Sequence, residues 1–137
     1  MSSLTATMRD AVFLRAGQRC EYCALSQVGQ EAVFHVDHVV PRSANGPTTE
    51  NNLALACVSC SLHKAAKLVA IDPDSGVETS IFNPRTQIWV EHFKWEKAIA
   101  VGLTAVGRAT ITALKMNRSL IVAIRNEEMI RGRHPDS

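Results

Sequence analysis

Two closely spaced cysteine pairs constrain this chain more than any other feature of its sequence. Cys20 and Cys23 form the first Cys-x2-Cys pair, and Cys57 and Cys60 form the second. Four thiolates arranged in two such pairs are the ligand set of a tetrahedral structural zinc site, which leaves no open position for chemistry. The alternatives are two disulfides or four unrelated thiols, and both are disfavoured in the cytoplasm, where disulfides are rare. The pairs therefore predict a zinc ion that holds the fold together, with an insert between the two knuckles.

Size and composition fit one globular domain. The chain has 137 residues, of which 46% are hydrophobic and 20% are charged, as is usual for soluble domains. No apolar run approaches the roughly 20 residues that span a bilayer, and the first ten residues lack the basic flank and apolar stretch of a secretion signal. We therefore expect a cytoplasmic protein without a membrane partner.

The charge is distributed unevenly along the chain. The formal net charge is +2. Residues 1–84 carry six Lys/Arg against eight Asp/Glu, whereas residues 85–137 carry nine against five. A basic C-terminal part is compatible with a polyanionic partner, and equally with a solvated helix face that carries spare arginines.

Hydrophobic periodicity and turn residues predict a mixture of helices and strands. Thr5 is the expected N-cap of a first helix that Gly17 ends, and Pro41 ends a strand rich in β-branched residues. The further expected elements are a turn-rich loop over 42–52, a brief strand over 53–57, a helix over 61–70, a turn over 72–76, an extended piece over 79–84, a helical pattern over 87–97, and two helices that begin at Thr104 and Asn117.

The residue types needed for phosphodiester hydrolysis lie in the insert. Asp37 and His38 close the predicted strand. Neutral imidazole can take a proton from water near pH 7, and one carboxylate suffices to seat a divalent cation. The simpler interpretation is that Asp37 and His38 are a hydrogen-bonded structural pair. On a regular strand, adjacent residues such as these point to opposite faces. His35 shares the face of Asp37, either towards an active cleft or as a satisfied structural histidine.

The order of these motifs resembles a known family. Cys-x2-Cys, Asp-His-Val-x-Pro-Arg-Ser, Asn-Leu, a second Cys-x2-Cys and then Lys64 follow one another from Cys20 to Lys64, which is similar to the zinc-bearing HNH endonucleases. Residues 81–93, 107–110 and 116–117 also resemble the tail of a bacterial subgroup of these proteins. The resemblance implies a ββα-metal finger, in which two strands, a loop and a helix clasp one catalytic cation. It also implies that His38 is the general base, Asp37 a cation ligand, and Asn52 the residue that fixes the loop against the base.

One position departs from the family pattern. The residue after the last cysteine is often His or Asn and supplies the second cation ligand, but in this chain it is Ser61. The second ligand is therefore expected to be Ser61 or, two residues later, His63. Trp89 and Phe93 are expected in the core rather than as a base-stacking platform. Phosphate contacts are expected from Arg42, Lys64 and Arg85, and further candidates are Arg15, Arg19 and Lys67.

The sequence thus predicts an α+β fold, a ββα-metal finger stapled by a four-cysteine zinc, with an N-terminal helix and a C-terminal helical extension. Residues 1–137 are predicted to form a single HNH endonuclease domain, with a core over about 18–70 and the extension over about 85–132. The predicted activity is hydrolysis of DNA by water that His38 activates, with structural Zn²⁺ and catalytic Mg²⁺ or Mn²⁺/Ni²⁺. Alternatives are a zinc-stabilised DNA-binding module with weak or no turnover, and an accessory nuclease active only within a larger DNA-processing assembly. A homodimer is a further expectation.

Overall fold

The computed structural model describes residues 3–135, which form an α+β fold of short elements. The helices are α1 (Ala6–Arg15), α2 (Val58–Lys64), α3 (Trp89–His92), α4 (Ala105–Ala113) and α5 (Ser119–Ile130). The strands form three antiparallel two-stranded sheets: β1 (His35–His38) with β2 (Leu53–Ala56), β3 (Val69–Ile71) with β4 (Glu78–Ser80), and β5 (Phe93–Glu96) with β6 (Ile99–Gly102). Three single turns of 3-10 helix lie at Gln27–Gly29, Arg42–Ala44 and Glu50–Asn52.

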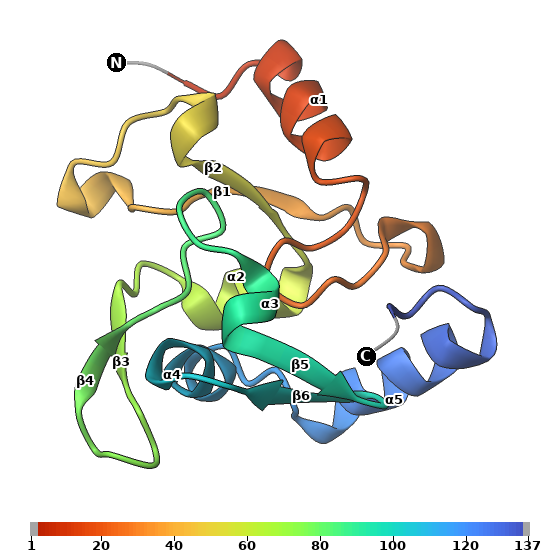
Figure 1. The fold of residues 1–137 in the computed structure, drawn as a ribbon. Helices are drawn as coiled ribbons and strands as arrows, with labels where there is room; N and C mark the ends of the chain where they lie inside the picture. Colours follow the sequence, from red (N-terminus) through yellow and green to blue (C-terminus); the bar gives the residue numbers. More distant parts are fainter. Residues whose placement is uncertain (1–2, 136–137) are drawn as a thin grey trace.

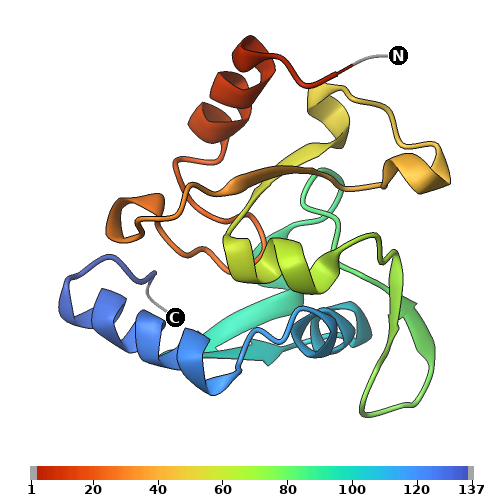
Figure 2. The ribbon, with the colours of Figure 1, turned by 180° about the vertical axis from the view of Figure 1, so that it is seen from behind.

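The β1–β2 sheet lies between α1 and α2, and the C-terminal elements pack below α2 (Figures 1 and 2). In its register Asp37 lies opposite Ala54 and His38 lies opposite Leu53. Directly opposed residues of an antiparallel pair share a face. His35 and Asp37 therefore share one face of the sheet with small alanines, and His38 shares the other with two fully buried leucines, Leu53 and Leu55.

Most predicted elements are confirmed, with shifted ends. The helix expected over 61–70 is wrong in its second half, because α2 ends at Lys64 and β3 begins at Val69. Thr5 caps α1, since its hydroxyl accepts a hydrogen bond from the Met8 N–H at 3.1 Å. Thr104 caps α4 in the same way and accepts from the Gly107 N–H. In α5, Ile121 and Arg125 are buried, whereas Leu120 is 57% exposed.

The helical pattern expected over 87–97 is wrong beyond its first turn. Helix α3 spans only Trp89–His92, and the chain then runs into β5 and turns back as β6. Along β5, buried Phe93 and Trp95 alternate with exposed Lys94 and Glu96. This period of two belongs to a half-buried strand, so the aromatic side chains reach the core only if the backbone is extended. The C-terminal extension is therefore mixed rather than purely helical.

Phe93 is buried in the core, as expected, and Trp89 is partly buried against it. Trp89 stacks on Phe93 with ring centroids 4.9 Å apart and on Trp95 at 5.3 Å. The Trp89 indole N–H donates to the Tyr22 carbonyl at 2.8 Å, which joins the extension to the first cysteine knuckle. The buried guanidinium of Arg125 lies 5.0 Å from the Trp95 ring centroid, a cation–π geometry. These contacts make the extension part of the same packed core as the cysteine-bearing segment.

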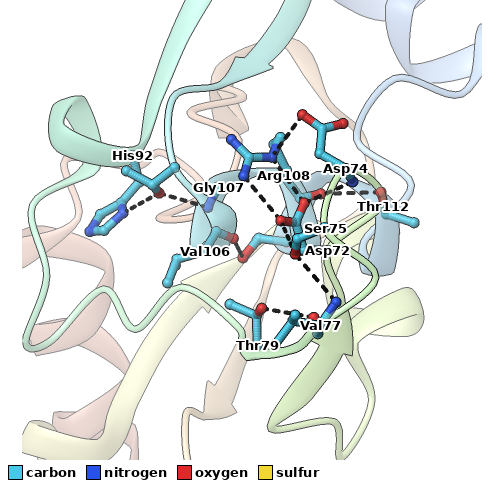
Figure 3. Close-up of polar contacts among 12 residues, drawn as sticks. Asp72, Asp74, Ser75, Val77, Thr79, His92, Val106, Gly107, Arg108 and Thr112 are labelled. Carbon is cyan, nitrogen blue, oxygen red and sulfur yellow. Dashed lines mark hydrogen bonds and ion pairs between the residues drawn. The ribbon is translucent and has the colours of Figure 1, made fainter.

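An ion pair fastens the β3–β4 hairpin to α4 (Figure 3). The fully buried Asp72 accepts two hydrogen bonds from Arg108, at 2.9 and 3.0 Å, and one from the Ser75 hydroxyl at 2.7 Å. The Arg108 and Ser75 hydrogen bonds hold the pKa of the Asp72 carboxyl well below its usual range. The predicted turn over 72–76 is present, closed by a hydrogen bond from the Gly76 N–H to the Asp72 carbonyl. The charge of Arg108 therefore stabilises the packing of the β3–β4 hairpin against α4.

The helices within residues 3–135 include none that is both long enough and apolar enough to cross a membrane.

Candidate active site and metal centre

The four cysteines come together in one buried cluster. Their sulfurs all lie within 4.8 Å of one another, and each residue is at most 3% exposed. Cys23 Sγ lies 3.6 Å from Cys57 Sγ, and all four cysteines are free thiols. A disulfide would place two sulfurs about 2 Å apart, whereas four sulfurs at about 2.3 Å from a tetrahedral zinc lie about 3.8 Å from one another. The cluster therefore fits a structural zinc ion and not a pair of disulfides.

Each knuckle presents its sulfurs through backbone geometry. The Cys23 N–H donates to Cys20 Sγ at 3.4 Å, and the Cys60 N–H donates to Cys57 Sγ at the same distance. Hydrogen bonds of this kind favour the thiolate that a metal requires. The second knuckle is also the start of α2, because Cys57 is its N-cap. A zinc ion at this cluster would thus fix α2 relative to the first knuckle.

Glu21, within the first knuckle, connects that knuckle to the rest of the fold. One of its carboxylate oxygens accepts from the Leu55 N–H at 2.8 Å, and the other pairs with the Arg85 guanidinium. The Arg85 side chain is only 15% exposed. This pairing argues against a phosphate contact of Arg85, because the charge of Arg85 is already balanced by the Glu21 carboxylate.

His38 is held by one ring nitrogen at the end of β1. Its Nε2 lies 2.8 Å from the hydroxyl of Thr48, which is 5% exposed, and 3.4 Å from Arg42 Nε. These contacts leave Nδ1 as the nitrogen that can act on a substrate. Burial lowers the pKa of His38 below its ordinary value, the positive charge of Arg42 lowers it further, and the negative charge of Asp37 acts in the opposite direction. The lowered pKa favours the neutral imidazole, which is the form in which a general base can accept a proton.

Asn52 holds the loop that follows β1. Its Oδ1 accepts from the Val40 N–H at 2.9 Å, and its Nδ2 donates to the carbonyls of Val40 and Pro47, both at 2.9 Å. The loop fits around this amide because Gly46 has no side chain: a Cβ there would lie 1.7 Å from the Val40 carbonyl oxygen. The preceding residue, Asn45, has the left-handed φ of 65°, which asparagine tolerates. Asn52 thus closes the loop that carries Thr48 to His38.

Asp37, His35 and Ser61 form a second group of polar side chains beside α2. His35 Nδ1 lies 2.7 Å from the Ser61 hydroxyl, so Ser61 points from α2 towards β1. Asp37 is half-buried, and within residues 3–135 no hydrogen bond or ion pair occupies its carboxylate. An open hollow of about 400 Å³ is lined by Asp37, His35 and Arg9 among others. A carboxylate, an imidazole and a hydroxyl on adjoining elements are groups that can hold a divalent cation.

His63 does not join this group. Its Nδ1 contacts the Ser59 carbonyl at 2.8 Å, and the residue lines a different cavity, of about 180 Å³, together with Arg118 and Ile121. Residues two apart on a helix point about 200° apart around its axis, so Ser61 and His63 cannot face the same strand. This placement argues against the expected cation role of His63.

Lys64 also departs from expectation. It is 3% exposed, and its ammonium donates to the Val39 carbonyl at 3.1 Å. Burial lowers its pKa. This placement argues against the expected phosphate contact of Lys64, since the side chain ties the end of α2 to the end of β1.

Most of the other arginines and lysines expected to contact phosphate bind the chain itself. Arg15 donates to the carbonyls of Glu50 and Leu53. Arg19 and Lys67 likewise donate to backbone carbonyls. In the C-terminal part, Arg85, Arg108 and Arg118 also make internal contacts, so part of its basic bias belongs to the fold. Two exposed arginines lie beside the groups described above: Arg42 near His38, and Arg9 at the hollow next to Asp37.

Comparison with known proteins gives one match. The model of the HNH endonuclease family matches residues 20–67, from the first cysteine to just beyond α2. Residues 20–67 are thus similar to an HNH endonuclease domain, and this matched segment is called the HNH domain below. The HNH domain contains both cysteine pairs, His38, Asn52, Asp37 and Ser61. No curated protein matches the chain, and no solved structure matches it either.

Two residues of the HNH domain acquire importance only through the structure. Thr48 is one of two adjacent threonines in a turn-rich loop, and nothing in the sequence separates it from Thr49. His35 could be placed on the face of Asp37 by strand alternation, but its contact with Ser61 depends on how α2 packs. Arg9 lies on a helix outside the matched segment and carries no motif.

Proposed function

We propose that the chain is a metal-dependent DNA endonuclease in which His38 is the general base. A nuclease or DNA-binding function follows from the HNH domain. The observation that carries the proposal further is the held imidazole at the end of β1, whose Nε2 is engaged by Thr48 while Nδ1 is left for a water molecule.

The tautomer of His38 decides whether this arrangement can work. Nδ1 can accept a proton only if the ring proton resides on Nε2. A threonine hydroxyl can accept a hydrogen bond from Nε2–H, so Thr48 supports the reactive tautomer and orients the ring. Arg42 can only donate and would support the other tautomer, but its contact is long at 3.4 Å. A phosphate group near Arg42 would attract the guanidinium away from His38.

The residues beside α2 would hold the cation that the family implies. Asp37 offers a carboxylate that has no partner among residues 3–135, on the same face of β1 as His35. A divalent cation bound there would neutralise charge that develops on the scissile phosphate. Asp37 and His38 point to opposite faces of β1, but β1 is paired on one side only within the described residues. Side chains from both faces can therefore reach a phosphate that lies along its free edge.

Arg9 and Arg42 are the proposed phosphate contacts. Both are exposed, and they lie on the two sides of the proposed reaction centre, beside Asp37 and His38 respectively. Arginine recognises phosphate through a planar fork of N–H donors. Such contacts position the DNA backbone without reading its sequence.

A zinc-stabilised DNA-binding module without turnover is the second candidate. Ser61 favours it, because a neutral hydroxyl is a weaker cation ligand than the imidazole or amide that relatives often carry there.

A nicking assay separates the two candidates. Supercoiled plasmid is incubated with zinc-loaded protein in Mg²⁺, Mn²⁺, Ni²⁺ or metal-free buffer, and DNA affinity is measured in parallel. We expect divalent-dependent nicking that His38→Ala abolishes with nearly unchanged affinity, since the base acts on water while binding comes from phosphate contacts.

His92→Ala is the matched control, because His92 also pairs with a threonine, Thr104, at 2.7 Å but lies outside the HNH domain. Affinity without nicking in any cation would support the binding module. Equal loss of nicking in the two variants would remove His38 from the proposed chemistry.

A further inference from the structure

We propose that His35 is the second protein ligand of the catalytic cation, and that Ser61 orients His35 instead of binding the cation itself. The inference rests on the proposed function and names the ligand set of its cation. The contact between Ser61 and His35 gives Ser61 an orienting role. The second ligand of the cation is then His35 on β1 and not a residue on α2.

Strand geometry brings His35 and Asp37 to one cation. Residues two apart on a strand lie about 6.6 Å apart and point to the same face. A ligand atom on each side chain can then approach a cation between them at bonding distances of about 2.0–2.2 Å. The residues opposite His35 and Asp37 on β2 are Ala56 and Ala54, so neither side chain is paired across the sheet with a large one.

The hydrogen bond to Ser61 selects the nitrogen that remains free. With Nδ1 at 2.7 Å from the Ser61 hydroxyl, His35 can donate Nδ1–H and keep a lone pair on Nε2. A histidine that binds a metal almost always donates its other ring N–H to a neighbouring acceptor, which fixes its tautomer and orientation. The contact between His35 and Ser61 has this form. The Ser61 hydroxyl would then accept a hydrogen bond from His35 and hold this ligand in place, without binding the cation itself.

The neighbourhood of His35 is open to a cation and to a phosphate. His35 and Asp37 are half-buried rather than enclosed, and the hollow of about 400 Å³ that they line also includes exposed Arg9. An imidazole with one carboxylate favours Mn²⁺, Co²⁺ or Ni²⁺ over Mg²⁺, because nitrogen ligands suit transition ions and magnesium prefers oxygen.

Binding of Mn²⁺ to the zinc-loaded protein tests the assignment without relying on activity. Free Mn²⁺ is followed by its electron paramagnetic resonance signal during titration of the parent and of four variants. We expect His35→Ala and His35→Gln to weaken Mn²⁺ binding by about 100-fold or more, and Ser61→Ala to weaken it by about 10-fold, the lower end of the range that outer partners of metal ligands contribute. Glutamine keeps a donor for Ser61, so His35→Gln separates loss of the ligand from loss of the packing contact.

His63→Ala is the matched control, since it removes an imidazole from the same region while leaving β1 intact. Zinc content and circular dichroism establish that each variant is folded. Mn²⁺ affinity equal to the parent in both His35 variants would overturn the assignment, as would a parent that binds no Mn²⁺. Plasmid nicking by the parent tells the two failures apart. If the parent cuts DNA while the His35 variants bind Mn²⁺ normally, only the ligand assignment is refuted. If the parent neither binds Mn²⁺ nor cuts DNA, the proposed function is refuted as well.

Discussion

Replacing Asn52 by alanine removes three hydrogen bonds that hold the loop between β1 and β2, those to the Val40 N–H, the Val40 carbonyl and the Pro47 carbonyl. Asn52 is 8% exposed, so water replaces these partners poorly. Each such bond contributes about 1 kcal/mol net, which gives about 3 kcal/mol for the side chain. For a chain of this length that loss corresponds to a fall in Tm of about 10 °C.

The assay is thermal unfolding of zinc-loaded protein, with zinc content checked before and after. Asn51→Ala is the matched control, because Asn51 is the exposed neighbour and surface substitutions usually change stability by about 0.5 kcal/mol or less. Asn52→Asp sharpens the test. Its carboxylate keeps an acceptor for the Val40 N–H but places an oxygen against two carbonyl oxygens, so we expect it to be at least as damaging as alanine.

The same variants connect stability to chemistry. The loop that Asn52 closes also carries Thr48, which holds the Nε2 of His38. We therefore expect Asn52→Ala to reduce cleavage at temperatures where it remains folded. A Tm within 2–3 °C of the parent, corresponding to less than about 1 kcal/mol, would refute the assignment of Asn52 as the residue that closes the loop.

Three further predictions concern the zinc cluster and the base. Freshly purified protein should hold one zinc per chain, and Cys57→Ser should lose both the metal and cooperative unfolding; near-zero zinc with all four cysteines oxidised would contradict this. Burial and Arg42 lower the pKa of His38, and protonation of His38 removes the base. The cleavage rate should therefore fall at low pH with a midpoint below 6.5. Arg42→Ala should raise that midpoint, as followed by NMR titration of the ring, and an unchanged His38 titration would refute the charge effect. Thr48→Val should lower kcat by about 10-fold or more at unchanged DNA affinity, and Thr48→Ser should restore it; equal kcat in all three proteins would show that the hydroxyl does not position His38.

Local sequence patterns determined the cysteine cluster and the starts of two helices. Paired cysteines specify a four-thiolate cluster through spacing alone, because two residues between ligands let one turn of backbone present both sulfurs. The N-caps Thr5 and Thr104 are equally local, since a hydroxyl satisfies N–H groups of the next turn. Family resemblance added the order of motifs from Cys20 to Lys64, and the family match covers the same stretch.

Tertiary packing decided which charged and polar groups remain available to a substrate. In the sequence, Lys64, Arg85 and Arg108 are all possible phosphate contacts. In the structure Lys64 donates to the Val39 carbonyl, Arg85 pairs with Glu21, and Arg108 pairs with Asp72 of the β3–β4 hairpin. The β5 strand was missed because Phe93 and Trp89 also fit a helical spacing, and only burial of alternate residues against the core selects the extended form. His35 meets Ser61, and His38 meets Thr48, through segments 26 and 10 residues apart. Periodicity assigns a residue to a face, but which residue lies across from it depends on how the helix and the loop pack, and that packing is set by the whole core.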